Sequence, residues 1–182
     1  MTTSAPTAPR PDRWTTPLLA VAALTAGLMA GIFLIFDIAI TPGLAELADP
    51  AHAQAMAAFN RLIDGSALFV LVFLLPLPSA AVAAFTAWRA GRAATVWWAV
   101  AAGVSYLVVL VLTFAVNIPL NDELAALGTP APGADLSVLE RFDSVWRPAN
   151  TARTVFSFLA AAGALVAVTR PGPASRGGSA GR

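Results

Sequence analysis

The chain has 182 residues, of which 58% are hydrophobic and only 12% are charged. A soluble domain usually carries about twice that charged fraction, so a fully water-exposed globular fold is excluded and part of the surface must face lipid. The chain has no cysteine and a single histidine, His52. These counts exclude disulfides, thiolate metal sites and any metal site that needs several histidines from one chain.

Four long apolar runs follow one another, and we predict transmembrane helices at about 17–40, 62–88, 93–117 and 150–169. A helix that spans a membrane needs about 20 apolar residues. The runs do not alternate in polarity, as barrel strands would. The predicted fold is therefore all-α: a four-transmembrane-helix bundle over 17–170, with short helices in the two outer connections. Residues 1–16 and 171–182 are predicted to be disordered cytoplasmic tails.

Arginine placement predicts the orientation of the bundle. With four spans, one side holds the arginines before span 1, between spans 2 and 3, and after span 4: Arg10, Arg13, Arg89, Arg92, Arg170, Arg176 and Arg182. Basic residues collect on the cytoplasmic side. We therefore expect a multi-pass protein of the plasma membrane with both termini in the cytoplasm. The net charge of only +1 gives no support for nucleic-acid binding.

The connection before span 2 has its own helix signal. Asp49 followed by Pro50 is typical of a helix N-cap and its first helical residue. From there a helix could continue through Asn60 directly into span 2. Pro76 and Pro78 are expected to kink or interrupt that span, because proline removes a backbone donor.

The connection before span 4 also predicts a helix. Ser137 and Glu140 have the spacing of a capping box, and apolar residues then recur at helical period up to Trp146. We expect this segment to lie against the outer membrane face and to bend at Pro148 into span 4.

Polar residues at membrane depth fall at the outer ends of all four spans: Asp37, Asn60, Arg61, Asp64, Asn117, Asn121, Asn150 and Arg153. Residues four apart share a helical face, as Asn60 and Asp64 do. Ionisable groups inside a membrane usually face inward and pair, so we expect Asp37 or Asp64 to pair with Arg61 or Arg153. These residues could instead be interfacial and wetted by lipid headgroups. Their recurrence on four helices favours a polar pocket.

Three sequence pieces carry a resemblance to a known family. They are Met56-Ala57-Ala58-Phe59-Asn60-Arg61, Asn117-Ile118-Pro119-Leu120-Asn121, and the spacing Trp146-x-x-x-Asn150-x-x-Arg153. In this order and at span ends they resemble the small four-helix membrane family that includes anthrone oxygenases (DUF1772). The resemblance covers about Trp14 to Arg170. It implies a four-helix membrane fold and, for the characterised activity, oxidation of a polyketide anthrone to an anthraquinone by molecular oxygen without a cofactor.

The resemblance implies roles for the outer polar residues. Removing a proton from an anthrone gives an enolate that reacts with oxygen, so the protein must supply a base and groups that hold the enolate oxygen. Asp64 or His52 could be the base, and Arg153, Asn117 and Asn150 could hold the oxyanion. The predicted substrate-binding residues are Asn60, Asn117, Asn121, Trp146 and Asn150. The expected partners are membrane lipid and a small apolar or aromatic substrate.

Two other function classes stay open at this point. The chain could be a non-enzymatic bundle, such as a subunit or small-ligand binder, whose asparagines and arginine only hold the helices together. A transporter is less favoured, because no inverted repeat is visible. An enzyme should show Asn117, Asn150 and Arg153 converging on open space, whereas a structural network should leave no cavity between them.

Overall fold

A computed structural model describes residues 12–129, 135 and 137–170 of the chain, and these residues form helices and no strand. The predicted tails, 1–16 and 171–182, lie outside the described residues except for 12–16. The elements in chain order are α1 (Thr15–Ile35), a π-helical turn η1 (Phe36–Ile40), α2 (Thr41–Leu44), α3 (Asp49–Asp64), α4 (Ala67–Leu74), α5 (Pro76–Arg89), α6 (Ala93–Leu112), a second π-helical turn η2 (Thr113–Asn117), α7 (Ile118–Ala126) and α8 (Ser137–Thr169).

Four helical segments are long and apolar enough to cross a membrane: Thr15–Leu44, Ala67–Arg89, Ala93–Ala126 and Ser137–Thr169. Large apolar side chains cover the outside of these segments. Leu24, for example, is 74% exposed and Trp97 is 74% exposed. Such a surface is satisfied by lipid and not by water. The predicted all-α, four-span membrane fold is confirmed, with short helices in both connections.

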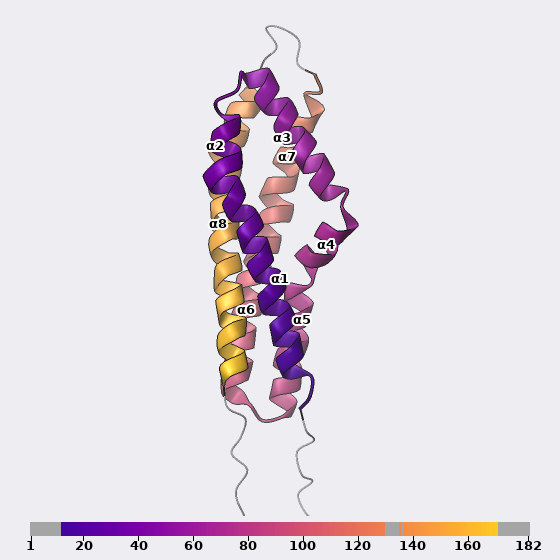
Figure 1. Ribbon diagram of the computed structural model, residues 1–182, viewed down its shortest axis with the longest axis vertical. Coiled ribbons are helices and arrows are strands. Elements are labelled where there is room, and N and C mark those ends of the chain that lie inside the picture. Colours follow the sequence, from indigo (N-terminus) through magenta and orange to yellow (C-terminus); the bar gives the residue numbers. More distant parts are fainter. Residues whose placement is uncertain (1–11, 130–134, 136, 171–182) are drawn as a thin grey trace, which may run out of the picture.

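The helices form a ring in which α1 packs against α8, α8 against α6, α6 against α5, and α5 against α1 (Figure 1). The start of α1, the α5–α6 connection and the end of α8 meet at one end of the bundle, which we call the basic end because it holds Arg89, Arg92 and Arg170. The opposite end carries α2, α3, α7 and the start of α8, and we call it the polar end.

A tight turn joins α5 to α6 at the basic end. Gly91 has φ +69°, the left-handed conformation that glycine adopts without strain. The Arg92 amide donates to the Ala87 carbonyl at 2.9 Å and the Gly91 amide donates to Trp88 at 3.0 Å. This is a Schellman motif, and it sends α6 back antiparallel to α5.

The core changes in side-chain size along the bundle. At the basic end it is built mostly of alanine, including Ala83, Ala102 and Ala164, so the helices can approach closely. At the polar end it contains large side chains such as Phe142 and Trp146. The larger side chains hold the helices further apart, which makes room for a cavity at the polar end.

Gly163 lies in a close contact between α8 and α6, and we predict that Gly163→Val destabilises the bundle by about 1–3 kcal/mol through overpacking. A Cβ at Gly163 would lie 3.4 Å from the Ala102 Cβ and 3.5 Å from its backbone. Gly31→Val is the matched control, because a Cβ there has nothing within 4 Å. Thermal unfolding in detergent measures the difference. Equal losses in both variants would mean that α6–α8 packing at Gly163 does not limit stability.

Two expectations about span 2 have different outcomes. The helix that starts at Asp49 does not run into span 2: it ends at Asp64, and α4 starts at Ala67 with Ser66 as its N-cap. Asp49 is also not the N-cap, since Ala48 holds that position. The interruption by proline is confirmed, because α4 ends at Leu74 and α5 begins at Pro76.

The expected membrane-surface segment before span 4 is wrong. Ser137–Thr169 is one helix with Pro148 inside it. Leu139, Phe142 and Trp146 are buried against α3 and α7 side chains and do not lie on the membrane face. The interior contacts that these side chains make at the polar end stabilise the helical conformation on the N-terminal side of the proline.

Candidate functional site

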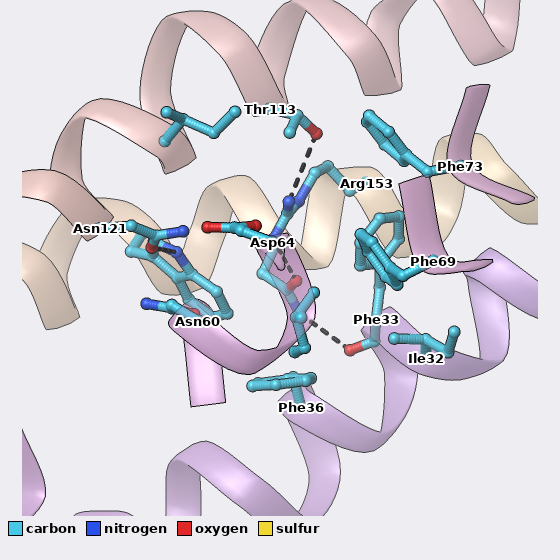
Figure 2. A pocket seen from close by; sticks show the side chains of 14 residues that line it. Ile32, Phe33, Phe36, Asn60, Asp64, Phe69, Phe73, Thr113, Asn121 and Arg153 are labelled. Atoms are coloured by element: carbon cyan, nitrogen blue, oxygen red, sulfur yellow. Dashed lines mark hydrogen bonds between the residues drawn. The ribbon is translucent and has the colours of Figure 1, made fainter. Parts of the chain in front are cut away.

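A cavity of about 50 Å³ lies at the polar end of the bundle. Since an ordered water needs roughly 10–15 Å³, it has room for only a few water molecules. Its walls come from α1, η1, α3, α4, η2, α7 and α8: Ile32, Phe33, Phe36, Asn60, Ile63, Asp64, Phe69, Phe73, Thr113, Ile118, Asn121, Trp146, Asn150 and Arg153. Figure 2 shows polar groups on one side of Arg153 and the phenyl rings of Phe33, Phe69 and Phe73 on the other.

Arg153 is the central cation of the cavity and is 7% exposed. Its Nη2 donates to Asn150 Oδ1 at 2.7 Å and its Nη1 donates to Thr113 Oγ1 at 3.3 Å. Its guanidinium carbon lies 4.3 Å from the ring centre of Phe33 and 5.4 Å from that of Trp146, both cation–π distances. Its Nε has no partner among the described residues. Arg153 is therefore held in place while donor capacity remains free.

The predicted ion pairs at this end are wrong. Among the described residues, no carboxylate oxygen lies within 4.0 Å of an Arg153 nitrogen, and Asp37 and Asp64 are in no salt bridge. Arg61 is exposed and does not line the cavity. The nearest acceptors of Arg153 are neutral oxygens, so the cation faces the cavity without a direct counter-charge.

Asn150 connects Arg153 to Asp37 on the neighbouring helix. Its Nδ2 donates to Asp37 Oδ1 at 2.6 Å and to the Phe33 carbonyl at 2.9 Å. A carboxylate and a carbonyl can only accept, which places the amide nitrogen toward α1 and the amide oxygen toward Arg153. Asp37 also accepts from Thr154 Oγ1 at 2.7 Å and Thr151 Oγ1 at 3.2 Å.

Two π-helical turns supply the acceptors from the other spans. Asp37 lies in η1 and Thr113 opens η2. The Thr113 hydroxyl donates to the Val109 carbonyl at 2.8 Å, which leaves its oxygen lone pairs for Arg153. Each wide turn rotates the residues after it relative to an unbroken α-helix. Such turns are frequent at functional sites, and here Thr113 contacts Arg153 directly whereas Asp37 contacts it through Asn150.

Two of the predicted substrate-binding asparagines hydrogen-bond to Trp146, which lines the cavity. The Trp146 Nε1 donates to Asn121 Oδ1 at 2.9 Å, which fixes the indole ring. Asn117 is fully buried and its Nδ2 donates to the Trp146 carbonyl at 3.4 Å. Asn117 does not line the cavity. The predicted convergence of Asn117 with Asn150 and Arg153 on open space therefore holds for only the last two.

Asn60 and Asp64 come from one face of α3 and both line the cavity. Asn60 is 7% exposed, and its Nδ2 has no partner among the described residues. Asp64 also lines a polar groove on the outside of α3 and α7, together with Arg61 and Asp122. Its carboxyl group thus lies between the cavity and the outside. Burial and the nearby charge of Asp122 raise the pKa of Asp64, and Arg153 works in the opposite direction.

His52 is not part of this site. It lies on α3 and is only 3% exposed. Its Nε2 lies 3.8 Å from Asp143 Oδ1, and it does not line the cavity. The geometry gives His52 no access to a ligand in the cavity.

Sequence reasoning missed Thr113 and the aromatic wall formed by Phe33, Phe69 and Phe73. A threonine or phenylalanine in an apolar span looks like ordinary lipid-facing or core material. One signal was present for Thr113: it precedes Asn117 by four residues, so both lie on one helical face.

One comparison with known proteins identifies the family. A family model described as anthrone oxygenase matches residues 59–163, from the residue before Asn60 to the span after Arg153. The chain belongs to the anthrone oxygenase family. No curated protein and no solved structure matches it. The match includes every polar residue of the cavity, and it agrees with the resemblance drawn from the sequence pieces.

The residues that line the cavity of this anthrone oxygenase family member define which kind of ligand it can hold. It offers a carboxyl group at the rim of the cavity, a buried guanidinium, an unpaired amide nitrogen and several aromatic rings. These groups suit an aromatic ligand that becomes negatively charged. Preorganised donors in a water-poor site stabilise such a charge far better than water-exposed donors do.

Proposed function

We propose that the protein is a cofactor-independent oxygenase that oxidises an enolisable aromatic ketone, such as an anthrone, in the cavity at the polar end. The observation that carries this proposal is Arg153, a buried cation that faces the cavity with no carboxylate within 4.0 Å among the described residues. An uncompensated buried charge is costly, and an anionic enolate would compensate it. Family membership supports an oxygenase-type membrane protein.

The proposed reaction balances without a further reactant. Asp64 takes a proton from the CH₂ carbon, and the electron pair moves onto the ketone oxygen, which Arg153 binds. The enolate carbon transfers an electron to O₂ and the two radicals combine, forming a C–O bond and a peroxide anion. Asp64 returns its proton to the peroxide. Loss of the second C–H proton with cleavage of the O–O bond then leaves a C=O group and water. O₂ is the oxidant, and one molecule is consumed for each quinone.

Substrate binding requires the cavity to widen, because a three-ring ketone needs more space than a few water molecules. The short helix α4 contributes Phe69 and Phe73 to the wall and buries only Phe73. Breaks in the helix separate α4 from α3 and from α5, and α4 runs at an angle to the bundle axis (Figure 1). We expect α4 to move when substrate enters. We also propose that the basic end faces the cytoplasm of the cell that makes the protein, in accord with its arginines.

The deciding experiment measures oxygen uptake and quinone formation by the purified protein in lipid nanodiscs with anthrone. We expect one O₂ consumed per anthraquinone formed, at a rate above that of empty nanodiscs. The matched substrate control is 10,10-dimethylanthrone, which has no proton to lose and should not react. If anthrone reacts no faster than in empty nanodiscs, the oxygenase proposal is wrong and the cavity belongs to a non-enzymatic binding protein.

His52→Gln is expected to leave the rate of anthrone oxidation close to the wild-type rate, because His52 does not line the cavity. The measurement is the same oxygen-uptake assay at saturating anthrone. A large loss of rate in a variant that stays folded would mean that His52 reaches the substrate in a conformation different from this one.

A further inference from the structure

We infer that Asp37 is a positioning residue for Arg153 and acts through Asn150. Three groups on two helices form a directed chain of hydrogen bonds: Arg153 Nη2 donates to Asn150 Oδ1 at 2.7 Å, and Asn150 Nδ2 donates to Asp37 Oδ1 at 2.6 Å. Arg153 and Asn150 are on α8, and Asp37 is on η1. The inference concerns the cavity of the proposed function, but its first test needs no substrate.

The acceptor at Asp37 determines which way Asn150 points. A free asparagine amide can turn over, which exchanges its acceptor for its donors. At Asn150 both protons of Nδ2 have acceptors on the α1 side, namely Asp37 and the Phe33 carbonyl. The oxygen must then face Arg153. If the amide were reversed, it would present N–H groups to a guanidinium that can only donate.

Asp37 is itself held rigidly. Its second carboxylate oxygen accepts from Thr154 Oγ1 at 2.7 Å, one turn beyond Asn150 on α8. Thr41 Oγ1 donates to the Phe36 carbonyl at 2.7 Å within the same π-helical turn. The backbone that carries Asp37 and the face of α8 that carries Asn150 are therefore joined at several points. A supporting group of this kind keeps an active side chain in its productive position.

The amide between Asp37 and Arg153 also separates the two charges. A carboxylate in direct contact would occupy the N–H groups of the guanidinium and neutralise its charge. Here the contact is to a neutral oxygen, and only two of the five guanidinium N–H groups are used. Arg153 is thus oriented by Asp37 while its charge stays available to an anion in the cavity.

The first test uses ¹⁵N NMR of the Arg153 guanidinium in nanodiscs, assigned by loss of the signal in Arg153→Gln. In the wild type we expect two separate Nη signals, since both nitrogens donate to fixed acceptors. In Asp37→Asn the charged acceptor of Asn150 Nδ2 is lost, so Asn150 holds Arg153 Nη2 less firmly and we expect the two signals to merge. Asp143→Asn is the matched control at the same end, and its Nη signals should stay separate. Merged signals in the wild type, or separate signals in Asp37→Asn, would overturn the inference.

The second test uses Asn150→Asp combined with Asp37→Asn, which keeps the shape of both side chains, puts a carboxylate directly on Arg153 and leaves a donor at position 37 for it. We expect its Nη signals to stay separate while kcat for anthrone falls by on the order of 100-fold, the loss expected when an oxyanion donor is removed. Wild-type kcat in this double variant would overturn the role of the amide, even if Asp37→Asn alone does not fold. Failure of the wild type to oxidise anthrone would count against the proposed function alone, since the NMR result decides the positioning role.

Discussion

Asp64→Asn should lower the rate of anthrone oxidation by roughly 100- to 10,000-fold, the usual contribution of a general base. The amide keeps the shape of the side chain and cannot accept the proton from the CH₂ carbon. Asp64 lines both the cavity and the outer polar groove, so its carboxyl group can reach a ligand in the cavity and stay in contact with water outside. Oxygen uptake at saturating anthrone measures the effect. A variant that keeps more than a tenth of the rate would exclude Asp64 as the base.

The pH dependence gives an independent check on the same residue. Asp64 accepts a proton only when ionised, so the rate should fall as pH falls through its pKa. Burial and Asp122 raise the pKa of Asp64, so this acid limb should lie above the ordinary carboxyl range. Asp122→Asn removes one of those causes and should move the limb to lower pH without changing the maximal rate. Glu123→Gln is the matched control, because Glu123 pairs with Arg141, and it should leave the limb in place.

Arg153→Gln should lower kcat/KM for anthrone by about 100- to 1,000-fold, the loss typical of removing a donor to a developing oxyanion. The variant keeps a hydrogen-bonding side chain but loses the charge and the guanidinium fork. Arg153→Lys keeps the charge and should restore only part of the rate, since one ammonium cannot reproduce the two fixed contacts to Asn150 and Thr113. Oxygen uptake over a range of anthrone concentrations separates the effects on kcat and KM.

Arg147→Gln is the matched control on the same helix, because Arg147 is exposed and does not line the cavity. Its kcat/KM should stay at the wild-type value. The circular dichroism and thermal unfolding of Arg153→Gln must also show a folded bundle. A folded Arg153→Gln with unchanged kcat/KM would mean that the guanidinium only joins helices and takes no part in the reaction.

Helix length and spacing predicted much of this molecule. The four spans followed from apolar runs in a medium that allows no unpaired backbone groups. The shared face of Asn60 and Asp64 followed from their separation by four residues. Trp146, Asn150 and Arg153 line one cavity because α8 stays helical through Pro148. The catalytic and binding roles assigned to these residues stay predictions.

The rest depended on contacts between distant segments. An ion pair was the obvious partner for a buried arginine, but the structure places an amide between Arg153 and Asp37. The sequence gives no indication that Asn150 lies between Arg153 and Asp37, because all three residues are predicted at the same depth in the membrane. His52 was a candidate base on a polar connection, yet it is buried and does not line the cavity. Such outcomes depend on how helices pack, and helix spacing alone does not specify them.

The two π-helical turns determine where the protein can tolerate the deletion of a single residue. Each π-helical turn contains one residue more than the same length of regular α-helix would contain. Deleting a single residue from 36–40 or 113–117 would let the helix close into regular α-turns. The segment beyond the deletion would then turn by about 100°, one residue's rotation in a 3.6-residue turn. A deletion at position 36 would displace Asp37 from α8, and a deletion within 113–116 would displace Asn117 from the carbonyl of Trp146. Single-residue deletions in these two places should therefore be far less tolerated than deletions in the connection between α7 and α8.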